Sequence, residues 1–116
     1  MVQSEPGRRI REVRFYKSGR GREPVREWLG SLSAEQKKVI GRDIKTLQLG
    51  WPIGMPLARK MGPRIWEVRS RLDMGFARVL FTVNQETIVL LHGFIKKSMK
   101  TPTRELNTAK KRMRRL

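Results

Sequence analysis

Residues 65–95, IWEVRSRLDMGFARVLFTVNQETIVLLHGFI, decide the fold because they hold three extended segments separated by two short turns. Within residues 65–71 and 75–83, apolar and polar side chains alternate, which is typical of strands that bury one face. Residues 87–95 are almost continuously apolar, as expected of a central strand covered on both faces. Since short turns join antiparallel neighbours, the stretch predicts a three-stranded meander.

The preceding part of the chain predicts one more strand and two helices. Residues 10–17 alternate in the same way and should form the first strand. Pro24 suits the first position of a helix, and apolar residues follow it at helical spacing. Ser33 and Gln36 form a capping-box pattern that opens a second helix, which Gly50 should end. Because the linker between the helices is short, we expect a helical hairpin.

Residues 51–64 contain three prolines and two glycines and are predicted to be an ordered loop. A last helix should begin near Pro102, with the chain before it leaving the final strand. Its narrow apolar stripe consists of Leu106, Ala109 and Met113.

The resulting order is strand, helix, helix, strand, strand, strand, helix. It predicts an α+β fold, in which a small antiparallel-rich sheet carries the helical hairpin packed on one face. A chain of 116 residues suits a single domain over residues 1–116 and is too short for two. We expect residues 1–8 and 113–116 to fray.

The charge is strongly one-sided, with 27 Lys and Arg against 10 Asp and Glu and a formal net charge of +17. Such a surface attracts polyanions, and we favour nucleic acid over anionic lipid. With no cysteine and one histidine, we expect neither a disulfide nor a metal site, and no cofactor. No apolar run approaches the ~18 residues of a membrane span, so we expect a soluble cytoplasmic protein without a membrane partner.

Basic side chains interrupt the strands at Arg69, Arg78, Lys96 and Lys97. A solvated sheet face can explain any one of them. If the strands are adjacent, however, all four converge toward one side of the sheet, where several cations could hold one phosphate. For the set as a whole, we therefore favour an anion site over a solvated face.

Other residues allow both a structural and a functional interpretation. His92 lies in the apolar strand, where a packed, hydrogen-bonded core histidine is favoured and acid–base catalysis is the alternative. All three tryptophans are expected to pack in the core, although Trp51 in the loop could stack on a base. The basic side chains toward the C-terminal end could bind RNA or remain solvated, and they are Lys100, Arg104, Lys110, Lys111, Arg112, Arg114 and Arg115.

The segments IWEVR (65–69), RVLFTV (78–83) and IVLLHGFIKKSMKTPTRE (88–105), followed by a basic helix, resemble the HigB branch of the RelE/ParE toxin superfamily, including its phage-derived members. The resemblance begins at VRFYKS (13–18) and extends through the last helix. It implies a RelE-like fold. It also implies a toxin that is paired with a helix-turn-helix antitoxin and cuts messenger RNA on the ribosome without metal.

The resemblance assigns candidate catalytic residues as well. Lys60, in the predicted loop, is a looser match to the basic positions of the family. Relatives commonly carry a Tyr or His near the C-terminal segment as an acid–base group, which this sequence lacks after Lys97, and Glu67 stands where some relatives have another basic residue. The strand positions that match are Arg69, Arg78, Lys96 and Lys97.

RNA cleavage is chemically consistent with these residues. The 2′-OH is an internal nucleophile, so an enzyme must position it, accept its proton, stabilise the phosphorane and protonate the leaving 5′ oxygen. Arginines can supply the stabilisation, and a lysine among other cations gives up its proton more readily. Candidate acid–base lysines are Lys60, Lys96 and Lys97.

Two alternatives to an endonuclease remain open. One is a ParE-type protein that inhibits DNA gyrase, although such a protein needs no cluster of cations to cleave a phosphodiester. The other is a non-catalytic basic module that binds RNA or DNA.

Overall fold

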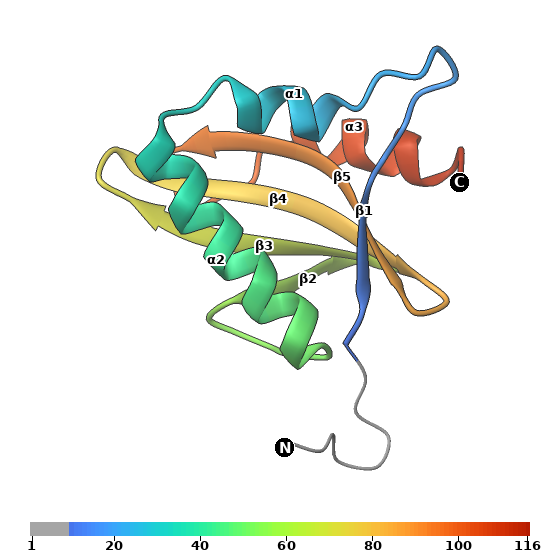
Figure 1. Cartoon of the computed structure of the whole chain (residues 1–116), viewed down its shortest axis with the longest axis horizontal. Coiled ribbons are helices and arrows are strands. Elements are labelled where there is room, and N and C mark those ends of the chain that lie inside the picture. The colour runs from blue at the N-terminus through green and yellow to red at the C-terminus, as the bar shows by residue number, and fades with distance from the viewer. Residues whose placement is uncertain (1–9) are drawn as a thin grey trace.

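The computed structural model describes residues 10–116, so the segment 1–8 lies outside the described residues. Five strands form one sheet and three helices cover it within this part of the chain (Figure 1). The strands are β1 (Glu12–Phe15), β2 (Ala58–Gly62), β3 (Ile65–Leu72), β4 (Gly75–Asn84) and β5 (Thr87–Lys96). The helices are α1 (Pro24–Gly30), α2 (Ala34–Gly50) and α3 (Thr103–Met113).

The sheet is mixed, with the strand order β1-β5-β4-β3-β2. β1 lies parallel to β5, where Val13 is opposite Ile88, and the other neighbouring strands are antiparallel. The predicted meander of β3, β4 and β5 is confirmed, as is the α+β class. β5 lies between β1 and β4, which agrees with its continuous apolar sequence.

The interpretation of residues 51–64 as a loop is corrected by β2, which occupies Ala58–Gly62. The prolines that suggested a loop lie outside this strand, and Pro63 follows it directly. β2 is an edge strand with an irregular register between Lys60 and Gly62. Edge strands tolerate flanking prolines and bulges, because one of their sides forms no ladder.

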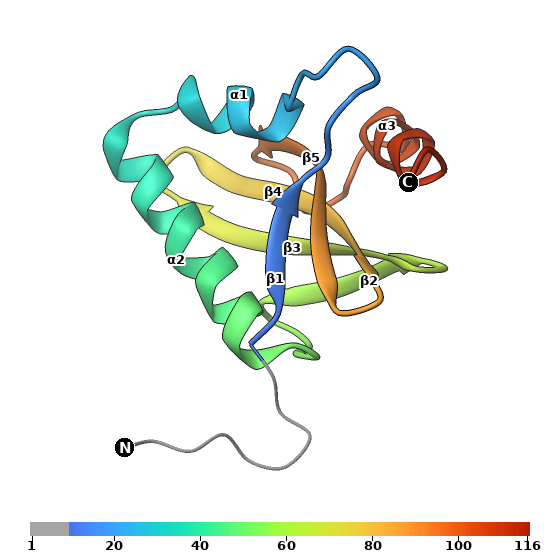
Figure 2. The same cartoon turned by 45° about the vertical axis from the view of Figure 1, so that its right-hand side comes forward.

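Both N-terminal helices begin where the sequence predicts. Pro24 is the first residue of α1. The Gln36 amide donates to the Ser33 hydroxyl at 3.1 Å, and the Ser33 amide donates to the Gln36 side chain at 3.0 Å, which confirms the capping box. α1 packs against β1 and β5, and α2 packs against β3. Figure 2 shows α2 and α3 on opposite sides of the sheet.

The alternation along β4 divides the core into two parts. Val79 and Phe81 belong to the core beneath α1 and α2, whereas Leu80 belongs to the core beneath α3. Turn hydrogen bonds continue past the end of α3 to Leu116, and the fraying of residues 113–116 stays a prediction. The apolar stripe predicted for α3 is confirmed, and its residues in the second core are Leu106, Ala109 and Met113.

The three tryptophans pack as expected. The rings of Trp51 and Trp66 are 5.0 Å apart, and Phe81 lies 5.3 Å from Trp51, both in edge-to-face contact. Trp28 of α1 lies against Gly93 of β5, where an added Cβ would be 2.3 Å from the indole ring. Gly93 therefore allows α1 to approach the sheet closely.

Replacing Gly93 with alanine should lower the free energy of unfolding by about 1–3 kcal/mol, because the new methyl group displaces the Trp28 ring. Denaturant unfolding measures this loss. Gly41→Ala is the matched control, since Gly41 is an exposed α2 residue with no described atom within 4 Å of the added Cβ. Helix propensity predicts that the control gains up to ~1 kcal/mol. Equal stabilities of the two variants would contradict the close packing at Gly93.

Candidate functional site

β3 and β4 bring Arg69 and Arg78 together. The two residues are directly opposite each other in the antiparallel register, and Arg78 is also opposite Phe94 of β5. Lys96, at the end of β5, is opposite Phe76, which lies two positions before Arg78 in β4. Since alternate residues share a face, the register places all three basic residues on one side of the sheet.

Arg78 is completely enclosed, with an exposed fraction of 0%. Its guanidinium donates to the Thr101 hydroxyl at 3.0 Å and to the Ser98 carbonyl at 2.5 Å. The Thr101 hydroxyl donates to the Glu67 carboxylate, which is also fully buried. Burial lowers the pKa of Arg78, and the negative charge of Glu67 counteracts this shift.

This network fixes the segment that follows β5. The segment contains Lys97 and Lys100, which are both exposed and lie outside any helix or strand. Arg78 holds it at Ser98 and Thr101, from the strand beneath. The buried arginine thus positions exposed lysines.

The Arg69 side chain is half-buried and forms fewer hydrogen bonds than that of Arg78. Its guanidinium carbon lies 4.9 Å from the centre of the Phe76 ring, and one of its nitrogens is 3.5 Å from the Met99 sulfur. Three buried atoms of this cluster have no hydrogen-bond partner among the described residues, namely Nε of Arg69, Nε of Arg78 and one carboxylate oxygen of Glu67. Arg69 therefore retains donor capacity for a ligand.

β2 brings Arg59 toward this cluster, whereas the sequence suggested Lys60. Lys60 is opposite Trp66, with its ammonium 5.8 Å from the ring centre, and Trp66 packs on the core beneath α1 and α2. Arg59 is opposite Glu67 instead, and its charge contributes to the lowered pKa of Arg78. Arg59 was not predicted as a site residue, because residues 51–64 were interpreted as a loop and the sequence ARKMG of β2 lacks a clear alternation of apolar and polar side chains.

His92 lies between the sheet and α3. One ring nitrogen is 2.8 Å from a Glu105 oxygen, the other is 3.4 Å from the Arg112 guanidinium, and the ring stacks on Phe94. An irregular register in β5 leaves Leu91 without a direct partner and turns His92 toward the helix. These contacts describe the packed, hydrogen-bonded histidine that the sequence favoured.

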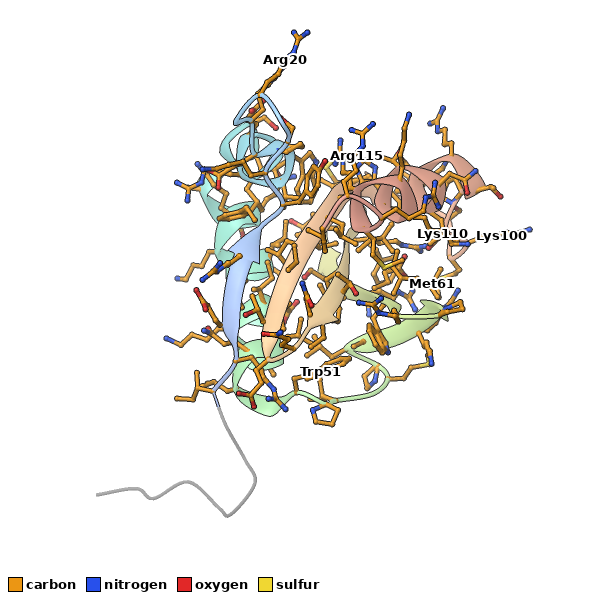
Figure 3. All side chains as sticks on the ribbon, turned by 90° about the vertical axis from the view of Figure 1, so that its right-hand side faces the viewer. Arg20, Trp51, Met61, Lys100, Lys110 and Arg115 are labelled. Atoms are coloured by element: carbon orange, nitrogen blue, oxygen red, sulfur yellow. The ribbon has the colours of Figure 1, made fainter. Side chains whose placement is uncertain are left out.

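The basic residues of α3 differ in their surroundings. Arg112 donates to the Leu91 carbonyl at 2.7 Å and lies over the Tyr16 ring, and burial lowers its pKa. Lys110 is half-buried beside Gly62 of β2. Figure 3 shows Lys110 on α3, Arg115 just past the end of this helix and Lys100 in the segment before it. The basic residues that remain exposed are Lys100, Arg104, Lys111, Arg114 and Arg115.

Acidic and histidine side chains are sparse at this site. Among residues 10–116, no group of three or more His, Cys, Asp or Glu side chains could hold a metal ion.

In the same part of the chain, no helix has both the length and the apolar character needed to cross a membrane.

The fold and the site define a small, basic α+β protein that gathers cations on one face of a mixed sheet. Residues 27–114 match the family described as phage derived protein Gp49-like (DUF891). Because the match covers most of the chain, the protein belongs to this family. The family is related to the superfamily of RelE/HigB-like toxins. β1 precedes the matched residues. No curated protein matches the chain.

Proposed function

We propose that this protein is a HigB-type toxin of a type II toxin–antitoxin system and that it cuts messenger RNA on the ribosome. The observation that carries the proposal is the pairing of Arg69 with Arg78, beside an exposed lysine segment that Arg78 anchors. Membership of the Gp49-like family and the net charge of +17 support the same function.

In this proposal, exposed cations contact the RNA and Arg78 positions them. Arg69 and Lys97 hold the scissile phosphate, and Lys96 adds positive charge at the end of β5. Arg78 acts through the segment that follows β5, because its own side chain is enclosed. This role differs from the direct phosphate contact that the sequence suggested for Arg78. Lys60 has no part in it, since its register places it on the other face.

The proposed reaction uses the nucleophile of the RNA itself. The 2′-OH attacks the adjacent phosphorus and loses its proton to solvent, while the bond from phosphorus to the 5′ oxygen breaks. Lys97 donates a proton to that oxygen, which gives a cyclic phosphate and a free 5′-OH. Arg69 stabilises the extra negative charge on the phosphorane.

The proposed partners follow from this function. The ribosome and its messenger RNA are the targets, and the site of action is the cytoplasm. A small helix-turn-helix antitoxin encoded by a neighbouring gene would neutralise the toxin. Co-expression of that neighbour should restore growth.

Inducing this chain alone should arrest bacterial growth and cut translated messages. Primer extension on one messenger RNA, before and after induction, maps the cuts. An Arg69→Ala variant produced at the same level is the control and should leave messages largely intact. Growth arrest with intact messages and gyrase-dependent DNA breaks would support the ParE alternative. RNA binding without cuts or arrest would support a non-catalytic module.

A further inference from the structure

An open groove lies at the edge of β3, beyond the last residue that pairs with β2. The groove has a volume of about 510 Å³ and extends from the sheet to α2. Its charged side chains are Arg42 and Asp43 of α2 and Arg69 and Arg71 of β3, and its apolar wall includes Leu57 and Phe76.

Three arginines and one aspartate therefore line the groove. Among residues 10–116, neither Arg42 nor Arg71 forms an ion pair. Arg69 has a buried Nε without a hydrogen-bond partner in the same part of the chain. A bound anion would relieve the repulsion between these cations and would accept their hydrogen bonds.

The apolar wall adds a second kind of contact. The Arg69 guanidinium lies over the Phe76 ring, and both side chains line the groove with Leu57. Unpaired nucleobases stack on aromatic rings and on guanidinium planes, whereas duplex RNA hides the faces of its bases. The volume also lies in the usual range of a small-molecule site, about 300–1,000 Å³, which suits one nucleotide.

We propose that this groove binds a nucleotide of single-stranded RNA next to the cleaved bond. Arg42 and Arg71 hold its phosphate, and its base lies against Phe76 and Leu57. The inference rests on the proposed function, because Arg69 belongs both to the groove and to the cleavage site. It adds α2 to the RNA-binding surface, for which the sequence predicted residues of the strands, of the loop 51–64 and of the C-terminal region only.

The test is equilibrium binding of a fluorescent ten-residue oligouridylate, measured by anisotropy at several salt concentrations. Arg42→Ala/Arg71→Ala should weaken binding about tenfold and lower the log–log salt slope by about 0.7 for each lost phosphate contact. Lys38→Ala/Lys45→Ala is the matched control, because it removes the same charge from exposed positions of α2 outside the groove. The control should change the Kd less than about twofold. Circular dichroism checks that both variants fold.

Equal losses in the two double variants would overturn the inference, since binding would then depend on net charge alone. Unchanged binding by Arg42→Ala/Arg71→Ala would also overturn it and leave the groove to another ligand, such as an acidic protein segment. Cleavage on programmed ribosomes separates the two proposals. If the wild type does not cut but the groove variant still loses RNA binding, the endonuclease proposal fails, and the groove remains a binding site for single-stranded RNA that is not tied to cleavage.

Discussion

Arg78→Ala should lower the free energy of unfolding by about 3–5 kcal/mol, because it removes the guanidinium whose positive charge offsets the buried Glu67 carboxylate across the Thr101 hydroxyl. The substitution also removes the donors to Thr101 and Ser98. Domains of this kind have a total stability of about 5–15 kcal/mol, so a large share would be lost. Denaturant unfolding followed by tryptophan fluorescence measures the change. Arg104→Ala, at an exposed site, should stay within about 0.5 kcal/mol of the wild type.

A second variant separates the effect on the fold from the effect on function. Glu67→Gln/Arg78→Met removes both buried charges, and neutral replacement of a buried pair often costs little stability. This variant should therefore recover most of the stability that Arg78→Ala loses. Its cleavage should remain low, because the lysine segment still lacks its anchor. Wild-type cleavage by the folded double variant would exclude a positioning role for Arg78, and wild-type stability of Arg78→Ala would contradict the buried network.

Arg69→Ala should lower single-turnover cleavage on programmed ribosomes about a hundredfold, which corresponds to about 3 kcal/mol of transition-state stabilisation. The protein should stay folded, because the half-buried side chain contacts the Phe76 ring and the Met99 sulfur and forms no ion pair among the described residues. Ribosome binding is spread over many cations and should fall much less. A binding isotherm and a cleavage time course on the same ribosomes measure the two effects.

Lys111→Ala is the charge-matched control for Arg69→Ala, since Lys111 is an exposed residue of α3. It should reduce the salt dependence of binding slightly and leave the cleavage rate unchanged. A rate for Arg69→Ala that falls only in proportion to ribosome binding would place Arg69 in binding and not in cleavage.

The pairing of Arg69 with Arg78 was accessible from the sequence for a physical reason. Alternation assigns each side chain of a strand to a face, and a short turn between two strands sets their register. The helix starts at Pro24 and Ser33 were predictable as well, because both depend on interactions within one turn of the chain.

The burial of Arg78 could not be predicted in this way. It depends on Ser98 and Thr101 folding back over β4, and this contact between distant residues leaves no periodic signal in the sequence. The sequence suggested Lys60 and not Arg59 for a related reason. Nearby prolines concealed β2, and without its register neither side chain could be assigned to a face.

The parallel pairing of β1 with β5 has a consequence for how the protein is made. Residue 13 has its ladder partner at residue 88, so the first strand emerges from the ribosome long before its neighbour is synthesised. Closing so long a loop costs entropy that only the finished pairing repays. Arg78 likewise gains its anchors only when residues 98 and 101 have been added. If the protein attacks ribosomes, the ribosome that is translating it is therefore spared at least until residue 101 has been synthesised.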